Sequence, residues 1–487
     1  MTPETSSKQH ERRWLILAMV GVAQLMVVLD ATIVNIALPS AQRALGFSND
    51  SRQWVVTAYA LAFGSLLLIG GRVGDYFGRK RALIGGLIGF ALASALAGLA
   101  QSFEVLVIAR ALQGAFGALL APSALSILTT AFTDPEERGK AFGIYGAIAG
   151  GGGAIGLLLG GVLTQYVDWR STLFVNLLFA LPAAAAAVIL LVNERPESRP
   201  RLDMAGAGTA TVGLFSLVYG FSNAETHGWG APLTVGALAA GAVLLSAFLV
   251  LQARGEHPLL PLRVLLDRDR GASFGAMAIA GSGSFGVFLF LTYYLQRTLG
   301  FSPVSTGLAF LPMMGAVVLS ATLISTRILP RTGPRPLVPV GMLLAALAML
   351  GLTGVGLHSG YAANVLPFLL VTGVGMGMIF APSMATATGN VDPGDAGVSS
   401  ALVNTMQQVG GSIGVALLST FSATAATSFA AAHGGTPSAL AAAAVHGYTT
   451  AFWWAAGIFL FGALFTSLLL RSGAQELDPA AAPALAH

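Results

Sequence analysis

The sequence contains fourteen apolar runs of about 20 residues, and this feature constrains the fold more than any other. A helix of that length crosses the roughly 30 Å hydrocarbon layer of a membrane. The composition agrees, because 55% of the residues are hydrophobic and only 9% are charged, too few to solvate a soluble protein of 487 residues. We therefore predict an all-α, multi-pass membrane protein. Its spans start near Trp14, Trp54, Ala82, Val105, Lys140, Ser171, Met204, Pro232, Gly271, Pro303, Leu337, Asn364, Gly397 and Tyr448.

Lys and Arg are distributed unevenly between the two sides that these spans imply. If the amino terminus is cytoplasmic, twenty of the 25 basic residues lie in cytoplasmic loops and tails and four lie in outer loops. Cytoplasmic loops of membrane proteins are enriched in basic residues, so both termini are expected in the cytoplasm. The scarcity of lysine beside arginine, with abundant Ala and Gly, is typical of a bacterial gene of high GC content. We predict a protein of the bacterial cytoplasmic membrane, surrounded by lipid and without a nucleic-acid partner.

The sequence offers no support for several classes of enzyme. It has no cysteine, which excludes disulfides, thiolate metal sites and cysteine nucleophiles. It has no Walker A loop and no HExxH zinc motif, and its formal GxGxxG match at Gly151–Gly156 lacks a preceding strand. We predict that the protein is not an enzyme, needs no cofactor or metal, and takes its energy from an ion gradient.

Two halves of the sequence repeat short patterns in the same order, which predicts two similar six-helix units. Four matches keep an offset between 254 and 260: Leu45 with Leu299, Gly78 with Gly333, Ala121 with Ala381, and Asp134 with Asp392. Parallel repeats of this kind flank a central substrate site near the membrane midplane. The predicted organisation is a cytoplasmic tail at 1–13, a six-helix bundle at 14–195, an inserted helix pair with cytoplasmic linkers at 196–265, a second six-helix bundle at 266–472, and a cytoplasmic tail at 473–487.

One acid and one base lie inside apolar runs of the first half. Asp30 stands within the first run, where an acid costs at least about 2.5 kcal/mol to insert and is a functional candidate by default. Arg110 lies in the fourth run at a similar depth, on the same helix face as Gln113 and Gly114. Asp30 and Arg110 could pair directly or through water. Such a pair would serve proton coupling, or alternatively be a fixed structural ion pair.

The loop after the second run reads GRVGDYFGRKR, and its spacing suggests a gate. Gly70, Gly74 and Gly78 recur every four residues, which predicts a smooth helix face that another helix approaches closely. Asp75 stands at the cytoplasmic end of that helix, where it would pair with the basic residues Arg79 or Lys80. A plain positively charged loop is the alternative, although it would not need this spacing of glycine and acid.

Three segments resemble motifs of the major facilitator superfamily. Gly71–Lys80 is similar to motif A, Ala109–Gly114 to motif B, and Leu29–Pro39 to the first-helix signature of its fourteen-span drug:proton antiporters. The resemblance implies the major facilitator fold and multidrug efflux. For motif A it also implies a cytoplasmic gate that latches the two halves together in the outward-facing state, formed by Gly71, Asp75, Gly78, Arg79 and Lys80. The motif B residues are Arg110, Gln113 and Gly114.

A glycine stripe in the fifth run resembles motif C of the antiporters. Its residues are Gly152, Gly156, Gly160 and Gly161. In that motif a Gly-Pro pair precedes a Gly-Gly pair, whereas here Leu157 stands where the proline is expected. The missing proline keeps open a symporter or facilitator for a small metabolite on the same fold.

Uncharged polar residues are the candidates for substrate contact, since both intramembrane ions lie in the first half. The predicted cavity is lined by Asn35, Tyr59, Tyr293, Gln296, Asn404 and Gln407. The prediction as a whole is a monomeric, proton-coupled antiporter that exports amphipathic drug-like or antibiotic molecules by alternating access. A sensor or assembly protein without transport is the alternative from another class.

Overall fold

The computed structural model describes residues 3–48, 51–132, 134–192, 203–255, 258–389, 391, 396–434 and 436–471. Within these ranges every regular element is a helix. The predicted tail 473–487, the linker at 193–202, the side chain of Asp75 and the repeat position Asp392 lie outside the described part of the chain. The first helix begins at Pro3, so the described residues of the predicted amino-terminal tail continue that helix.

The helices follow one another along the chain with short connections. In the first third they are α1 (Pro3–Leu45), α2 (Gln53–Phe77), α3 (Arg79–Gly98), α4 (Phe103–Ala131), α5 (Pro135–Tyr166) and α6 (Ser171–Leu190). The middle contains α7 (Met204–His227), α8 (Pro232–Arg254), α9 (Leu262–Leu266), α10 (Arg268–Tyr293) and the π-helix η1 (Tyr294–Thr298). The remainder contains α11 (Pro303–Leu323), η2 (Ile324–Ile328), α12 (Leu329–Thr332), α13 (Pro334–Leu352), α14 (Tyr361–Asn364), α15 (Leu366–Thr388), α16 (Ala396–His433) and α17 (Pro437–Leu469).

Twelve of these helices are long and apolar enough to cross a membrane, counted over the described residues. Helices α2 and α5 are 25 and 32 residues long, but the apolar stretches described in them, Gln53–Leu67 and Gly152–Tyr166, are shorter than a full span. A helix satisfies its own backbone hydrogen bonds, which a lipid-embedded segment requires. The chain is therefore a multi-span helical protein, and the total of fourteen spans stays a prediction.

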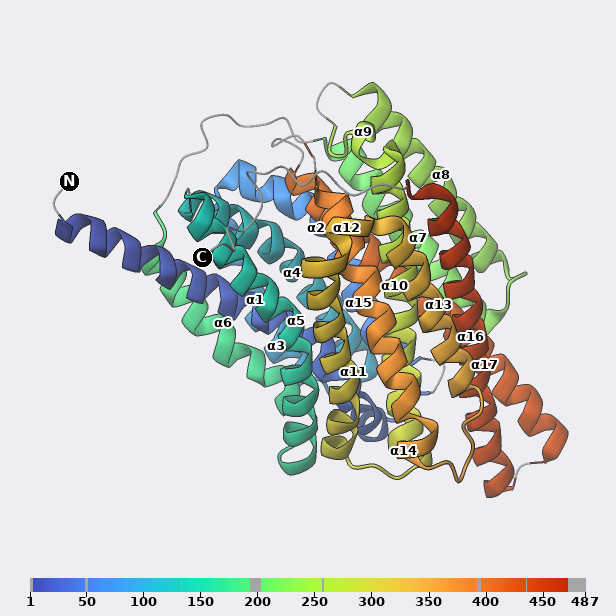
Figure 1. The fold of residues 1–487 in the computed structure, drawn as a ribbon. Coiled ribbons are helices and arrows are strands. Elements are labelled where there is room, and N and C mark those ends of the chain that lie inside the picture. The colour runs from blue at the N-terminus through green and yellow to red at the C-terminus, as the bar shows by residue number, and fades with distance from the viewer. Residues whose placement is uncertain are drawn as a thin grey trace.

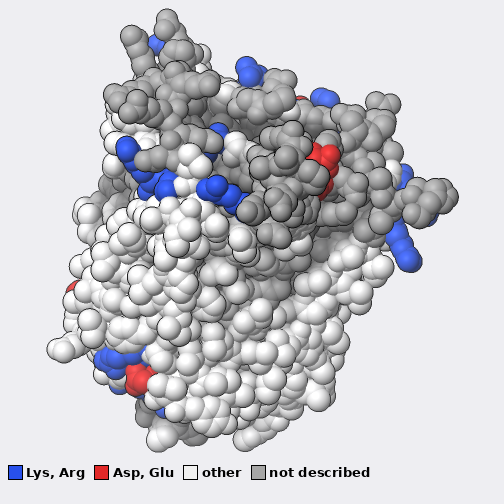
Figure 2. Space-filling view, turned by 90° about the vertical axis from the view of Figure 1, so that its left-hand side faces the viewer, with Lys and Arg blue, Asp and Glu red and all other residues white. Residues whose placement is uncertain are grey.

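The loops gather at two opposite ends of the molecule (Figure 1). We call the end with the turn after α1 the Gly46 end, and the end with the turn between α2 and α3 the Gly78 end, which lies at the top of Figure 1. Among the described residues, Figure 2 shows a wide belt with almost no charged side chains between Lys and Arg residues near the top and a small charged group near the bottom. An uncharged belt of this kind fits the hydrocarbon layer of a membrane.

The sequence repeat has a matching local structure in the two halves. Gly46 and Gly300 both adopt a positive φ, of 71° and 69°, which a residue with a side chain rarely adopts. Two residues later, Ser48 and Ser302 each accept a hydrogen bond from a backbone N–H three residues on, at 3.2 and 3.1 Å. Gly78 and its counterpart Gly333 also share a positive φ. The repeated letters therefore mark repeated turns.

Helix packing follows the same repeat. In the first bundle α1 packs on α5, α2 on α4, and α3 on both α4 and α6. In the second bundle the equivalent pairs are α10 with α16, α11 with α15, and α13 with α15 and α17. The two bundles meet where α5 packs on α11 and α2 packs on α16, which are again equivalent positions.

Helices α7 and α8 pack on each other beside the two bundles. Helix α7 also contacts α2 and α16, so it lies along one of the seams between the bundles. Two hydrogen bonds fix it to α2: Gln53 donates to Ser222 at 3.1 Å, and Thr211 donates to the carbonyl of Ser65 at 3.3 Å. Helix α8 is mostly exposed, since only 17% of its apolar stretch is buried inside the protein. This exposure suits a lipid-facing helix at the rim.

Candidate functional site

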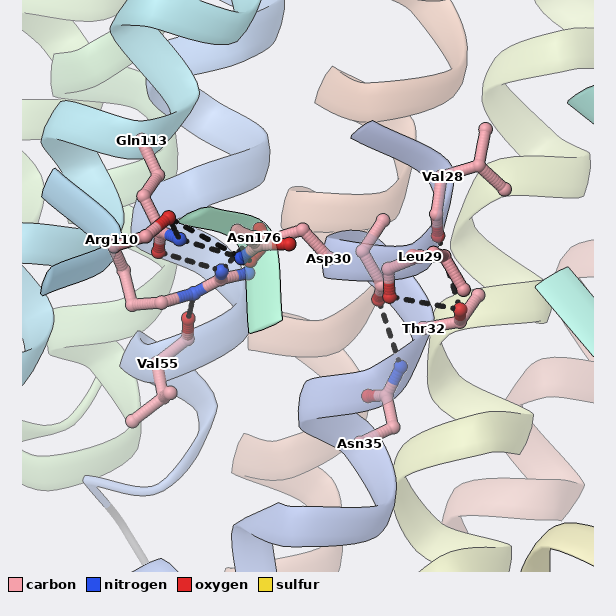
Figure 3. A network of polar contacts seen from close by, with 11 residues as sticks. Val28, Leu29, Asp30, Thr32, Asn35, Val55, Arg110, Gln113 and Asn176 are labelled. Carbon is pink, nitrogen blue, oxygen red and sulfur yellow. Dashed lines mark hydrogen bonds and ion pairs between the residues drawn. The ribbon is translucent and has the colours of Figure 1, made fainter. Parts of the chain in front are cut away.

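A buried ion pair joins α1 to α4 (Figure 3). Arg110 NH1 lies 2.5 Å from Asp30 Oδ2, and the two side chains are 2% and 0% exposed. The sequence allows Asp30 and Arg110 to pair directly or through water, and in the structure they pair directly. Because both charges are out of water, each depends on its partner and on further hydrogen bonds for its stability.

Two amide side chains complete the surroundings of the Asp30 carboxylate. Gln113 Nε2 and Asn176 Nδ2 donate to Asp30 Oδ1 at 2.9 and 2.7 Å. Both nitrogens also donate to the hydroxyl of Ser94, at 2.7 and 3.3 Å. Helices α1, α3, α4 and α6 thus each contribute a polar side chain to one network. Asn176 and Ser94 are absent from the sequence prediction, and the only signal for Asn176 is an amide inside an otherwise apolar run.

Arg110 has partners besides the carboxylate. Its Nε donates to the carbonyl of Val55 at 3.1 Å, and its NH1 donates to Gln113 Oε1 at 2.9 Å. The guanidinium carbon lies 4.5 Å from the centre of the Tyr59 ring, close enough for a cation–π interaction. The arginine is therefore held by α2 and α4 as well as by Asp30.

Glycines at the helix crossings bring these side chains together. A Cβ on Gly114 would lie 2.3 Å from the carbonyl oxygen of Tyr59, so α4 approaches α2 as closely as only glycine permits. On α5, Gly152, Gly156 and Gly160 face α1, whereas Gly161 faces Pro303 of α11. The motif C-like stripe thus packs α5 against the helix that carries Asp30.

The motif A region differs in part from the prediction. Gly71 and Gly74 face α4, as a smooth helix face should. Gly78, however, does not extend that face: it ends α2 with a φ of 95°, because the chain turns there into α3. Arg79 donates to the carbonyl of Ser126 at 3.4 Å, within the first bundle.

Lys80 also binds within the first bundle. Its Nζ donates to the carbonyls of Val188 and Leu191 at the end of α6, at 2.7 and 2.5 Å. A cation is stabilised there by the negative end of the helix dipole. In this structure the two basic residues of motif A therefore bind their own bundle at these contacts, and the pairing expected for Asp75 lies outside the described side chains.

Three of the six predicted cavity residues make contacts with neighbouring helices in this structure. Tyr59 lies against Arg110, and Tyr293 and Gln296 contact α1 near the Gly46 end. In this structure the three side chains pack against or hydrogen-bond to neighbouring residues. An aromatic or amide side chain in an apolar run looks the same in sequence whether it lines a cavity or joins two helices. The remaining candidates lie on α1 and α16: Asn35, Asn404 and Gln407.

A cluster at the Gly46 end joins the two bundles. Tyr293 Oη and Arg297 NH2 both donate to Gln42 Oε1, at 2.8 and 2.9 Å, and Gln296 Nε2 donates to the carbonyl of Ile36 at 3.1 Å. We call these residues, with Arg52, the Gly46-end cluster. Arg52 is only 6% exposed, and its guanidinium carbon lies 4.1 Å from the centre of the Tyr293 ring. Arg52 is one of the four basic residues that the sequence predicts in outer loops.

Comparisons with known proteins agree with the observed architecture. The family model of the Major Facilitator Superfamily matches residues 20–415. A puromycin resistance protein of Streptomyces alboniger is 49% identical over 96% of this chain and 93% of that protein. A cephamycin export protein of Amycolatopsis lactamdurans is 39% identical over 86% of each chain. A solved bacterial homolog of the human lysosomal transporter Spinster, inward-facing and unoccupied, has a TM-score of 0.65 at 16% identity, over 94% of this chain and 97% of that one, a likeness of fold.

Proposed function

Since this chain belongs to the Major Facilitator Superfamily, we propose that it exports an amphipathic antibiotic-like molecule in exchange for protons. The protein is a transporter and not an enzyme. The observation that carries the proton coupling is the buried Asp30–Arg110 pair, because an ionisable group inside the membrane marks a proton or substrate pathway. The resistance and export proteins to which the chain is similar support export of an antibiotic, with puromycin as the first candidate.

In this proposal Asp30 is the proton site and Arg110 is its electrostatic partner. The carboxylate is bound to Arg110 when it is ionised, and a proton arriving from outside neutralises it and weakens the pair. Each proton that enters gains about 2.3 kcal/mol per 100 mV of membrane potential. A pH gradient adds about 1.4 kcal/mol per unit. That energy would drive one bundle to rock against the other around the bound substrate.

The contacts between the bundles support a state that is closed at the Gly46 end. We take this end as the outer one, in line with the distribution of basic residues. The Gly46-end cluster holds α1 and α2 against α10 and η1 there, whereas Arg79 and Lys80 at the other end bind their own bundle. Alternating access would then break the Gly46-end cluster and engage the motif A residues across the seam. Asn35, Asn404 and Gln407 are the proposed substrate contacts between the two ends.

Proton release from inverted vesicles tests this function. In vesicles acidified inside, puromycin added outside should enter and release protons from the lumen, because the vesicles present the cytoplasmic face outward. Asp30→Asn should abolish that release while the protein remains inserted, since the amide keeps the shape of the side chain without its proton. Asp168→Asn is the matched control, because this acid is 52% exposed at the Gly46 end and should leave the exchange unchanged.

Two outcomes would contradict the proposal. Undiminished proton release with Asp30→Asn would remove Asp30 from the coupling step. Puromycin and protons that move in the same direction would favour the symporter, for which Leu157 in place of the motif C proline is the sequence argument. Resistance profiles of a pump-deficient host that expresses the gene would extend the test to cephamycins and other antibiotics.

A further inference from the structure

The two amides that contact Asp30 are held in different ways. Gln113 Oε1 accepts a hydrogen bond from Arg110, so its amide nitrogen can only face Asp30 and Ser94. Asn176 is fully buried, and its Oδ1 has no hydrogen-bond partner among the described residues. A buried acceptor without a partner is rare and calls for an explanation. The orientation of the Asn176 amide is therefore fixed only by the two bonds that it donates.

We propose that Asn176 is a two-position hydrogen-bond switch that follows the protonation state of Asp30. In one position its Nδ2 donates to the carboxylate, as in the structure. In the other position the amide has turned by half a rotation, its Oδ1 accepts a hydrogen bond from the O–H of the carboxylic acid, and its NH₂ group takes the place in which Oδ1 has no partner among the described residues. The switch rests on the proposed role of Asp30 as the proton site, and it makes Asn176 a positioning residue for that proton.

The hydrogen-bond inventory of the site requires an acceptor when the proton arrives. An ionised carboxylate only accepts hydrogen bonds, whereas a carboxylic acid has one O–H to donate. The three side chains hydrogen-bonded to Asp30 all present donors to it, namely Arg110, Gln113 and Asn176. A buried O–H without an acceptor would oppose protonation, since a buried polar group without a partner is costly. Of the three, only Asn176 has an acceptor that is not already engaged.

The rotation needs no extra space. Turning the amide about its Cβ–Cγ bond exchanges an oxygen and an NH₂ group of nearly the same size, and this torsion is broad and nearly two-fold. The added proton resides on Asp30 Oδ1, 2.7 Å from the amide nitrogen that the oxygen would replace. The Ser94 hydroxyl, which accepts from Asn176 at 3.3 Å, can rotate to donate to the same oxygen.

The charged and titratable groups around Asp30 do not take over this role. Arg110 from α4 faces the carboxylate directly, and the Tyr59 ring from α2 lies 4.5 Å from the guanidinium carbon. The side chains from α3 and α6, Ser94 and Asn176, are uncharged. When Asp30 is neutral, Arg110 keeps the Val55 carbonyl, Gln113 Oε1 and the Tyr59 ring, so it can stay charged without moving.

Infrared difference spectroscopy on the full chain in lipid nanodiscs tests the switch. The protein has eight asparagines, so labelling their side-chain carbonyls with ¹³C gives few bands, and Asn176→Leu identifies the band of Asn176. Between high and low pH we expect a carboxylic-acid band from Asp30 and a shifted amide band from Asn176 with the same midpoint pH. Both changes should disappear in Asp30→Asn. An Asp30 band without an amide shift overturns the switch alone, whereas no Asp30 band at any pH overturns the switch together with the proton site.

The midpoint pH in two variants separates a switch from a fixed donor. Gln113→Leu removes a donor that favours the ionised carboxylate, together with the bonds of Gln113 to Ser94 and Arg110, so the Asp30 band should appear at a higher pH than in the wild type. Asn176→Leu removes one hydrogen bond from ionised Asp30 and one from protonated Asp30, so the midpoint pH of the Asp30 band should stay close to that of the wild type. Puromycin-driven proton release should slow about tenfold, on the order of one hydrogen bond. Asn176→Ser, whose hydroxyl both donates and accepts, should restore part of the rate. An upward shift in Asn176→Leu equal to that in Gln113→Leu would show a fixed donor. If Asn176→Leu does not fold, the wild-type amide band, assigned with Asn176→Ser, decides the question.

Discussion

At the scale of single residues, the candidate coupling site depends on complete pairing. Asp30 accepts from three side chains, and Arg110 is bound by a carboxylate, a carbonyl and an amide oxygen. In a membrane interior no water solvates either charge. Removing one partner therefore leaves the other charge buried without compensation, which is strongly destabilising. The site is therefore sensitive to single substitutions and more tolerant of matched double ones.

The first prediction concerns this difference. Arg110→Ala should destabilise the protein by about 3 to 5 kcal/mol, because it leaves the Asp30 charge buried without its partner. The double variant Asp30→Asn with Arg110→Gln should lose markedly less, since neither charge remains. Thermal unfolding in detergent at neutral pH measures both. The single variants Asp30→Asn and Arg110→Gln complete a double-mutant cycle, and losses that simply add between them would show that the ion pair contributes no coupling energy.

Sequence reasoning found the charged members of the site and missed its neutral ones. Asp30 and Arg110 stand out because ionisable residues are rare in apolar runs, and Gln113 follows from helical spacing to Arg110. Ser94 and Asn176 gave no such signal, because a small hydroxyl or an amide in a membrane helix often bonds its own backbone or a neighbouring helix. Which bundle face an amide points to is a property of packing that one sequence does not contain.

At the scale of helices, close approach through glycine holds the site in place. Gly114 lies one helical turn from Arg110, and its backbone contacts that of Tyr59, so the position of the guanidinium depends on the spacing between α2 and α4. Other glycines lie where nothing is near. A Cβ added to Gly85 on α3 would meet no atom within 4 Å.

The second prediction contrasts these two glycines. Gly114→Ala should destabilise the protein by about 1 to 3 kcal/mol, because the new methyl group would force α2 and α4 apart. It should also lower the rate of puromycin-driven proton release. Gly85→Ala is the matched control and should be neutral or slightly stabilising, since alanine favours helix over glycine. Equal thermal stability of the two variants would contradict the close crossing of α2 and α4.

The third prediction concerns α7 and α8, which have no counterpart in the repeat. Deleting 202–252 removes two helices and keeps the orientation of all later ones. It should preserve substrate-dependent proton movement, because the network around Asp30 draws on α1, α3, α4 and α6. Stability should fall, since the bonds of α7 to Gln53 and Ser65 are lost. Correct insertion with no proton movement would place this pair inside the transport core.

Helix order was predictable from the sequence, and helix ends were less so. The repeat predicts the matching turns at Gly46 and Gly300, because a glycine with positive φ is fixed by local sterics. The apolar runs underestimate α1, which begins at Pro3 rather than near Trp14, because a helix can continue into water beyond the lipid. The π-helical segments η1 and η2 leave no trace in hydropathy.

At the scale of the whole molecule, the two ends of the seam between the bundles differ. The Gly46 end is joined by hydrogen bonds and by Arg52, whose guanidinium lies on the Tyr293 ring in the other bundle. Cation–π contacts that are shielded from water contribute about 2 kcal/mol or more. Arg52 therefore stabilises the contact between the two bundles at this end, which its predicted position in a loop did not suggest.

The fourth prediction measures that closure by crosslinking. The chain has no cysteine, so Gln165→Cys with Val304→Cys reports only on α5 and α11, where the Val304 N–H lies 3.3 Å from Gln165 Oε1. A short bifunctional thiol reagent should join the pair in high yield, and adding Arg52→Ala should reduce the yield several-fold. Arg170→Ala is the control, since that guanidinium lies on Trp169 of its own bundle. An unchanged yield with Arg52→Ala would exclude it from the closure.

The five side chains of the Asp30 network all come from residues 30–176, inside one bundle. If this network couples protons to transport, one uninterrupted stretch of the gene encodes all of its side chains. The second bundle is then not required to conserve these residues. Selection can then change the transported substrate by altering or exchanging the second bundle while the first bundle is retained. The segment that encodes α7 and α8 is the natural junction for such recombination.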